Sequence, residues 1–277
     1  MNMKRFLRNK VSCVGLVFVT IVICMGLFSP WLAPHDPLKH NMANRFADPS
    51  WQHVGGTDRY GRDVFSRTIW GARVSLLVGF SAVILGVGAG TILGMIAGFK
   101  KGRIGSGIMW LTDVFLSFPS LVLAIIVVVA FGANTRTVVF SIGLAFVPRC
   151  IRLSRASTLA VSEQMYVEAS KAVGQSDLKI IWKHILPNIS GEVIVMSTLW
   201  IATAIRLEAS LSFLGLGTQP PTPSWGMMVR AGTEHFIQSP LLCLVPGMGI
   251  FMATMGFNMI GDALRDNLDP KLRGQLG

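Results

Sequence analysis

Apolar residues along this chain gather into long runs that are separated by shorter polar and charged segments. A helix needs about 20 consecutive apolar residues to cross a hydrocarbon core of about 30 Å. Six runs come close to that length, so the pattern predicts six membrane-spanning helices. They are expected near residues 11–33, 74–98, 106–131, 136–157, 190–213 and 240–263. An even number of spans places both termini on the same side of the membrane.

The composition agrees with an all-α integral membrane protein. The 277 residues are 51% hydrophobic and only 14% charged, whereas soluble domains carry about 25% charged residues. Residues 1–10 are basic and precede the first apolar run, as in a secretory signal peptide. That run is longer than the about 7 to 15 apolar residues of such signals, and no A-x-A-like site follows it. We therefore expect an uncleaved first span.

The positive charge is distributed between the apolar runs. A net charge of +11 could suggest a nucleic-acid partner, but the position of each Lys and Arg gives a better explanation. One set of polar segments consists of the residues before 11, residues 100–103 and 149–183, and the residues after 264. This set contains about twice as many Lys and Arg as the other polar segments together. The positive-inside rule therefore predicts that both termini and residues 162–188 are cytoplasmic.

Glycine and proline mark special positions within the spans. Glycine recurs at every fourth position of the second run, at residues 86, 90, 94 and 98. This period puts the glycines on one helix face, where the missing side chains let another helix approach closely. Pro119 and Pro148 each remove a backbone hydrogen bond and predict static kinks in their helices.

Residues 162–188 interrupt the apolar runs and read as two short amphipathic helices. Ser162 is a candidate N-cap for the first helix. Its apolar face follows helical spacing through Met165, Ala169, Ala172 and Val173. Gly174 then stands where a left-handed C-cap is expected.

The second helix of this segment is expected to begin at Ser176 as N-cap, with Asp177 in the first turn. Its apolar face is predicted to consist of Leu178, Ile181, Trp182 and Ile185, and Pro187 closes the segment. Such a pair of helices either lies flat on the membrane or docks into a groove of a partner protein. The periodicity leaves both alternatives open.

The segment EASKAVGQSDLKIIWKHILPN, residues 168–188, resembles the EAA loop of the permease subunits of bacterial ABC importers. Five residues match that pattern in register: Glu168, Ala169, Gly174, Leu186 and Pro187. Ser170 replaces the second Ala of the pattern, and His184 stands where the pattern has Ile. An HILPN-like ending is typical of the peptide branch of these importers.

Other segments resemble the second permease of dipeptide, oligopeptide and nickel importers. They are SPWLAPHDP, GTDRYGRDVFSR, GARVSLLVG, EASLSFLGLGTQPPTPSWGMMV and NMIGDALRDNLDPKLRG. The resemblance implies the type I importer permease fold in a bacterial inner membrane, with a cytoplasmic coupling helix. It also implies four kinds of contact: cytoplasmic ABC ATPase subunits, a homologous second permease, an extracytoplasmic substrate-binding protein and the lipid bilayer.

The resemblance also suggests a domain organisation and a coupling site. Residues 1–73 would form an N-terminal tail, the first span and an external loop. Residues 74–264 would form the permease domain, with its coupling loop at 162–188, and residues 265–277 a cytoplasmic tail. The residues expected to contact the ATPase are Glu168, Ala169, Gly174, Leu178, Ile181, Ile185, Leu186 and Pro187.

The sequence predicts a permease rather than an enzyme, with no cofactor. It has no G-x-x-x-x-G-K-[ST] loop for ATP phosphates, so ATP hydrolysis is expected in partner subunits. HExxH, GxSxG and GxGD motifs are also missing. Di- or oligopeptides are the expected cargo, with nickel or glutathione import as alternatives. An ATPase-independent secondary transporter is a further alternative, although no inverted repeat is evident.

Ionisable residues inside spans are candidates for the translocation pathway, because they are costly to place in lipid. Arg206 and Glu208 lie in or near the fifth span, and a structural ion pair is the alternative for Arg206. No metal site is predicted. His35, His40 and His53 share one loop with two Asp, but their spacing matches no tight ligand motif.

Two segments between the spans are expected on the external side. Residues 55–67 contain Asp58 and Asp63 among three Arg, and we expect a folded loop cap rather than a substrate site. Residues 213–226 are rich in Gly and Pro and either contact the binding protein or form a rigid cap. Trp225 is a candidate aromatic anchor at the membrane interface.

Overall fold

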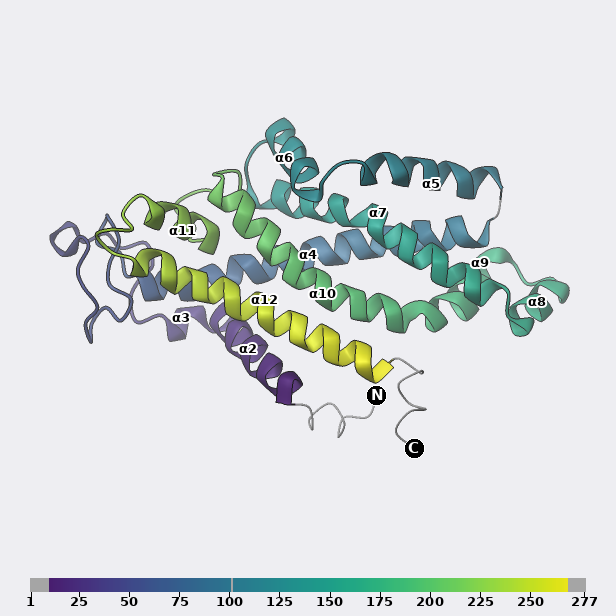
Figure 1. The fold of residues 1–277 in the computed structure, drawn as a ribbon, viewed down its shortest axis with the longest axis horizontal. Coiled ribbons are helices and arrows are strands. Elements are labelled where there is room, and N and C mark those ends of the chain that lie inside the picture. The colour runs from purple at the N-terminus through teal and green to yellow at the C-terminus, as the bar shows by residue number, and fades with distance from the viewer. Residues whose placement is uncertain (1–9, 101, 269–277) are drawn as a thin grey trace.

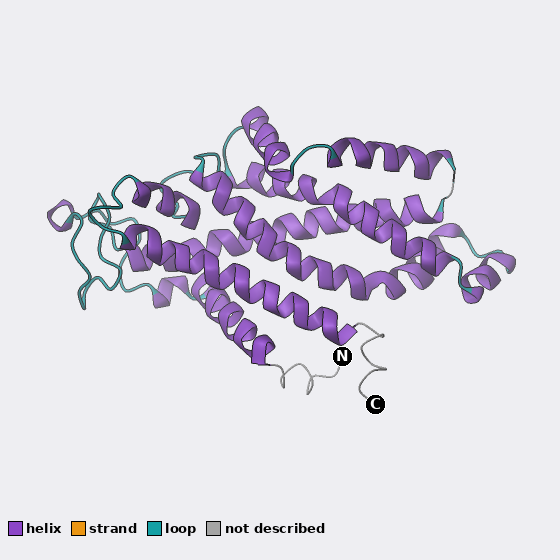
Figure 2. Ribbon diagram, viewed as in Figure 1, coloured by secondary structure: helices purple, strands orange, loops and turns teal. Residues whose placement is uncertain are grey.

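The structure of the protein is a computed structural model that describes residues 10–100 and 102–268. Within those residues the regular secondary structure is helical, apart from one isolated bridge between Thr57 and Asp63 (Figure 2). The helices, in chain order, are α2 (Lys10–Leu27), α3 (Ser29–Leu32), the 3₁₀ turn η1 (Met42–Asn44), α4 (Val64–Phe99), α5 (Arg103–Leu116), α6 (Ser120–Phe131), α7 (Thr135–Ser162), α8 (Met165–Ala172), α9 (Asp177–Ile180), the π turn η2 (Ile181–Ile185), α10 (Leu186–Phe213), α11 (Trp225–Thr233) and α12 (Leu241–Leu268).

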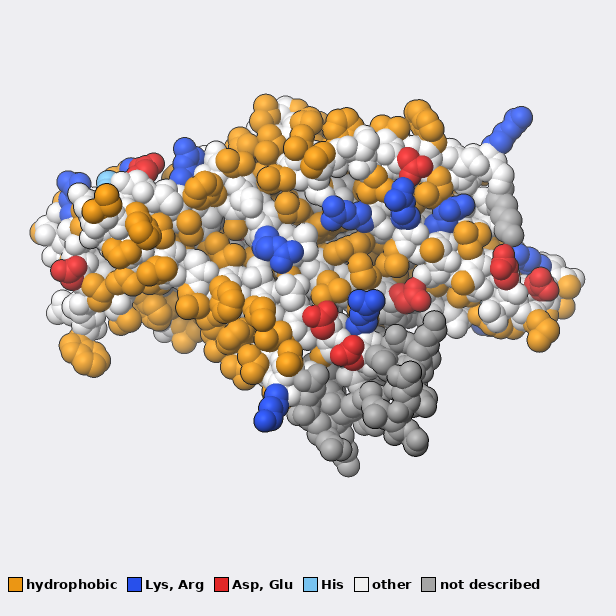
Figure 3. Space-filling model, viewed as in Figure 1, with side chains coloured by type: hydrophobic (Ala, Val, Ile, Leu, Met, Phe, Trp, Pro, Cys, Tyr) orange, Lys and Arg blue, Asp and Glu red, His pale blue; other side chains and the backbone are white. Residues whose placement is uncertain are grey.

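The long helices run roughly along one axis of the molecule (Figure 1). Irregular loops gather at one end, which we call the loop end, and α8 and α9 lie at the opposite end, which we call the α8 end. Hydrophobic side chains cover much of the helical surface between the two ends (Figure 3). Exposed examples are Ile84, Val129 and Phe131, as expected for helices that face lipid.

Five helical segments of the described chain are long and apolar enough to cross a membrane: α2, α4, α7, residues 177–213 and α12. The predicted third span is the exception. It consists of two helices, α5 and α6, which meet at an angle of 89° and give a sixth span only when counted together. The kink predicted at Pro119 is therefore confirmed in position, but it is a full break between two helices rather than a bend within one helix.

Pro119 accounts for the break between α5 and α6. It is the N-cap of α6, with an extended ψ of 135°. A proline also disfavours helical backbone in the residue before it, and here the chain leaves the helix at residues 117–119. Pro148 behaves differently, because α7 continues through it.

Helix α4 is longer than the second apolar run suggests. It starts at Val64, about ten residues before the predicted start of this span, and it has 36 residues. At 1.5 Å per residue it is about 54 Å long, so it extends well beyond a hydrocarbon core. Asp63 caps its first turn, because one carboxylate oxygen accepts a 2.7 Å hydrogen bond from the backbone N–H of Ser66.

The glycine face of α4 packs against α7, as predicted. A Cβ atom added at Gly86 would lie 2.6 Å from the carbonyl oxygen of Gly143. One added at Gly90 would lie 2.4 Å from the Cβ of Cys150. Contacts this short leave no room for a side chain, so the two helices meet backbone to backbone.

Trp225 ties the loop end to the helices. Its side chain is fully buried, and its indole N–H donates a 2.8 Å hydrogen bond to the carbonyl of Thr68 on α4. The ring also fills the space beside Gly71 and Gly249. The prediction that Trp225 anchors the chain at the membrane interface is therefore wrong, because this residue belongs to the protein core.

Candidate functional site

Residues 162–188, which we call the coupling segment, form the α8 end of the molecule (Figure 1). The predicted helix–glycine–helix layout is confirmed, with α8 before Gly174 and α9 after it. The prediction that Pro187 closes the second helix is wrong, because α9 continues through η2 into α10 and Pro187 lies in the first turn of α10. The second helix begins after Ser176, as predicted, although the Ser176 side chain makes no capping hydrogen bond. The predicted N-cap at Ser162 is wrong, because Ser162 is the last residue of α7 and Gln164 precedes α8.

Gly174 occupies the left-handed backbone region that its predicted role requires. Its φ is +77°, and the N–H of Gln175 donates to the carbonyl of Ser170 across the turn. This geometry closes the C-terminus of α8 and turns the chain into α9. No atom lies within 4 Å of a Cβ built at Gly174, so backbone conformation rather than lack of space explains why glycine is needed.

One side of the coupling segment is buried within the chain. Its inward residues, Val167, Ile180, Ile181 and Ile185, form an apolar cluster with Met95 of α4 and Ile189 of α10. Two residues predicted to contact the ATPase, Ile181 and Ile185, therefore face inward, and Leu186 is partly buried beside them. They support the segment instead of forming its outer surface.

The opposite side of the coupling segment exposes large apolar side chains. Met165 is 85% exposed, Val173 76%, Leu178 70% and Trp182 54%. Five of the predicted contact residues lie on the exposed part of the segment: Glu168, Ala169, Gly174, Leu178 and Pro187. Exposed apolar groups of this size within one short segment indicate contact with another molecule or with the membrane.

The π turn explains why the predicted apolar face of the second helix is wrong. A regular α-helix would place Leu178, Ile181, Trp182 and Ile185 together. The i→i+5 hydrogen bonds of a π turn insert one residue, and residues 181–185 adopt this form. The turn separates Leu178 and Trp182, which are exposed, from Ile181 and Ile185, which are buried.

His184 links the two halves of the coupling segment. A ring nitrogen of His184 lies 3.3 Å from the side-chain oxygen of Gln175, directly after the glycine turn. The backbone carbonyl of His184 accepts a 2.6 Å hydrogen bond from the side chain of Asn188. These contacts give His184 a role in holding the shape of the segment.

The two predicted pathway residues lie in different environments. Glu208 is fully buried between α4 and α10, where its carboxylate accepts hydrogen bonds from Ser75 at 3.2 Å and from Ser212 at 2.7 Å. Arg206 is exposed, and its guanidinium donates to the hydroxyl of Thr203. Because Glu208 reaches no surface of the chain, only Arg206 remains a candidate for lining a pathway.

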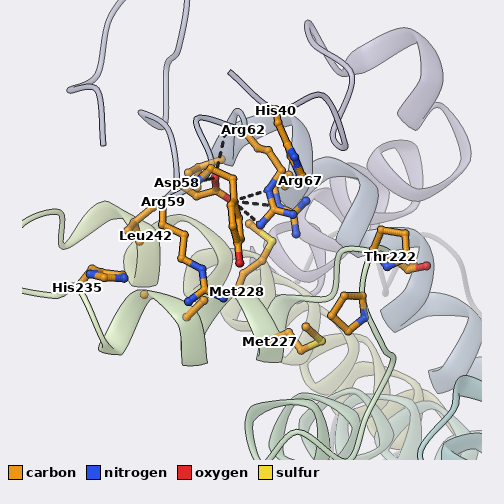
Figure 4. Close-up of a pocket in the computed structure, with 16 residues that line it drawn as sticks. His40, Asp58, Arg59, Arg62, Arg67, Thr222, Met227, Met228, His235 and Leu242 are labelled. Carbon is orange, nitrogen blue, oxygen red and sulfur yellow. Dashed lines mark hydrogen bonds and ion pairs between the residues drawn. The ribbon is translucent and has the colours of Figure 1, made fainter. Parts of the chain in front are cut away.

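A pocket of about 370 Å³ lies at the loop end (Figure 4). Its walls come from residues 40–67, the loop at 220–222, α11 and the start of α12. The prediction missed Met227, Met228 and His235, which reach the pocket from α11 and the turn after it. Long-range packing brings these residues beside residues 58–67, and no local sequence motif predicts that contact.

Ion pairs shape the charged wall of this pocket. Asp58 accepts from Arg62 at 2.7 Å and lies 3.8 Å from the guanidinium of Arg67. Arg67 also donates a 2.8 Å hydrogen bond to the carbonyl of Pro37. The expected offset of Arg by Asp in residues 55–67 is therefore present. Three Arg and one Asp line the pocket, which leaves an excess of positive charge.

Comparisons with known protein families match two stretches of the chain. Residues 90–274 match the family described as "Binding-protein-dependent transport system inner membrane component". Residues 1–49 match the "N-terminal TM domain of oligopeptide transport permease C". Together the two matches include both the coupling segment and the first span.

Individual relatives are similar over nearly their full length. The chain is 42% identical to a dipeptide transport system permease protein DppC of Alkalihalophilus pseudofirmus, over 98% of this chain and 89% of the relative. It is 39% identical to a di/tripeptide transport system permease protein DppC of Pseudomonas aeruginosa, over 97% and 90%. It is also 39% identical to a glutathione transport system permease protein GsiD of Escherichia coli, over 98% and 90%.

A solved structure shares the fold. An inward-facing structure of the MetNI methionine ABC transporter superposes on this chain with a TM-score of 0.51 and 14% sequence identity. The match covers 72% of this chain and 93% of the other chain. At this identity the similarity concerns the arrangement of helices alone.

Proposed function

On the premise that this chain belongs to the family of binding-protein-dependent transport system inner membrane components, and is a permease subunit of an ABC importer rather than its ATPase, we propose that it carries di- or oligopeptides. Support comes from relatives of about 40% identity that are named for dipeptide and di/tripeptide transport. Glutathione is the second candidate cargo, because a similarly close relative is named for it. The predicted fold class, a multi-span all-α importer permease, is confirmed.

The proposed coupling site is the exposed face of the coupling segment. The observation that carries it is the group of four exposed apolar side chains at the α8 end: Met165, Val173, Leu178 and Trp182. A binding-protein-dependent ABC system implies separate ATPase and binding-protein partners. In this proposal the ATPase covers these side chains, while Ile181, Ile185 and Leu186 transmit its movement to α4 and α10.

The proposed orientation places the two ends of the molecule on opposite sides of the membrane. The coupling segment and both termini face the cytoplasm of a bacterial cell, and the loop end faces outward, where the binding protein delivers substrate. The Lys and Arg of the coupling segment and its flanks support this orientation. A homologous permease completes the pathway, with Arg206 as a candidate lining residue. Residues 1–73, 74–264 and 265–277 remain the proposed N-terminal region, permease domain and cytoplasmic tail.

Co-purification and reconstitution test this function. Tagged protein from native membranes is expected to bring down ATPase subunits and a second permease. The reconstituted complex, supplied with its binding protein, is expected to hydrolyse ATP faster with a di- or oligopeptide than without one. Recovery of this chain alone, with uptake unchanged after ATP depletion, would exclude the ABC importer function.

The cargo is tested separately. Stimulation of the same complex by glutathione, with no response to di- or oligopeptides, would replace peptides by glutathione and leave the coupling site untouched. Stimulation by a nickel chelate alone would do the same for nickel.

A further inference from the structure

Three ligand-bearing side chains that are distant in the sequence meet at the loop end. His35, His53 and Asp63 each offer a nitrogen or oxygen atom, and these atoms all lie within 4.8 Å of one another. The rings of His35 and His53 have centroids 4.7 Å apart. A ring nitrogen of His53 lies 2.9 Å from one carboxylate oxygen of Asp63.

The fold holds Asp63 and His53 in place. The second carboxylate oxygen of Asp63 caps α4 by accepting from the Ser66 N–H, so the carboxylate has a fixed orientation. His53 sits in a turn in which its N–H donates to the hydroxyl of Ser50 and its carbonyl accepts from Gly56. The side chains are almost entirely enclosed, at 14% exposure for His53 and 1% for Asp63.

His35 completes the cluster from the water side. Its backbone N–H donates a 3.1 Å hydrogen bond to the hydroxyl of Ser66, the residue whose N–H binds Asp63. Its side chain is exposed. Ligand atoms of a tetrahedral zinc site lie about 3.4 Å apart, so metal binding requires the His35 ring to move closer to the other two side chains.

We propose that His35, His53 and Asp63 bind a divalent transition-metal ion of the zinc type. Two imidazoles with one carboxylate suit zinc and related ions, whereas calcium and magnesium prefer oxygen ligands. The ion binds between Nδ1 of His53 and the Asp63 carboxylate. It takes the neutral tautomer of His53 whose ring proton is on Nε2, and its remaining position is open to water. It fastens the loops around His35 and His53 to the first turn of α4. This site does not depend on the proposed cargo or topology.

Zinc titration of the full-length chain tests the site. The protein is purified in detergent with a tag that contains no histidine, stripped with a chelator and titrated with zinc in a calorimeter. Saturable binding of one ion per chain and a higher midpoint of thermal unfolding are expected. His35→Ala is expected to weaken binding by at least about tenfold, and because this side chain is exposed the variant keeps the fold of the apo protein.

The same loop offers a matched control. His40 stacks on Tyr60 at a centroid distance of 5.4 Å and lies outside the cluster, so His40→Ala is expected to bind zinc as the wild type does. Asp63→Asn retains a residue that caps helices well but removes the charged ligand, and should also weaken binding. Absence of saturable binding by the wild type, or equal affinity in the His35 and His40 variants, would overturn the proposal.

Discussion

The two ends of this molecule differ in how their side chains are paired or covered. At the loop end, charged residues pair with one another within the chain: Asp58 with Arg62, His53 with Asp63, and Arg59 with Glu234. At the α8 end, the coupling segment leaves most of the surface of Met165, Val173 and Leu178 exposed. The charged residues of the loop end are thus paired within the chain, whereas the large apolar residues of the coupling segment are left for the proposed ATPase to cover.

Packing differs between the two ends as well. Trp225 is buried with its hydrogen bond made, and it fastens the loop end to α4 and α12. The coupling segment is fastened by one apolar cluster on its inward side, around Ile181 and Met95. Substitutions at the loop end should therefore change stability, whereas outward substitutions at the α8 end should change binding.

The largest effect is expected at Trp225. Trp225→Ala removes a fully buried indole and its hydrogen bond to Thr68, and should destabilise the protein by about 3–5 kcal/mol. Thermal unfolding in detergent measures this change. Trp51, which is fully exposed at the same end, gives the control, and Trp51→Ala should leave the unfolding midpoint unchanged. Similar midpoints for the two variants would contradict the account of the loop end.

Two adjacent residues of the coupling segment allow its internal packing and its binding to the ATPase to be tested separately. Ile181 is 4% exposed, so Ile181→Ala should destabilise the protein by about 2–5 kcal/mol. Trp182 is 54% exposed, so Trp182→Ala should change stability by less than about 0.5 kcal/mol. The Trp182 variant should nevertheless bind the ATPase about 30-fold more weakly, the loss of about 2 kcal/mol that a central aromatic contact provides.

Unfolding scans and titration with purified ATPase measure these two properties. If Trp182→Ala bound the ATPase normally, the exposed face of the coupling segment would not be the docking surface.

The smallest effect is expected at Gly174. Gly174→Ala forces a Cβ into the left-handed region and should cost about 1 kcal/mol by backbone strain alone, because no neighbour blocks the new atom. Since the turn sets the angle between α8 and α9, this variant should also lower the ATP hydrolysis coupled to transport.

Gly132 provides the comparison for Gly174. Its φ is +89° and its surroundings are equally open, but it lies between α6 and α7. Its ψ of 147° lies outside the left-handed helical region, so Gly132→Ala should be strained at least as strongly as Gly174→Ala and still leave coupling unchanged. Equal coupling in the two variants would show that the α8 end tolerates a change in this turn.

Local patterns in the sequence predicted much of this structure. Long apolar runs predicted the spans, the glycines at 86–98 predicted the close contact with α7, and Gly174 predicted the left-handed turn. Each of these features depends on residues within a few positions of one another. The family resemblance carried by residues 168–188 is likewise a local pattern.

Features that depend on distant residues or on an altered helical period were not predicted. The π turn changes which residues of the coupling segment face inward, and apolar spacing alone favours a regular helix. Trp225 is buried because Gly71 and Gly249, far away in the chain, leave space for it. The meeting of His35, His53 and Asp63 depends in the same way on how the loop folds back onto α4.

Helix α4 connects both ends of the molecule as one stiff rod. Asp63 caps its first turn beside the loop cluster, and Met95 and Phe99, near its last turn, pack against the coupling segment. A rod of about 54 Å that tilts by about 5° carries its far end through about 5 Å. In the proposed coupling, a push that the coupling segment passes to Met95 would reach the loop end as a lever stroke, without any change in the helix itself.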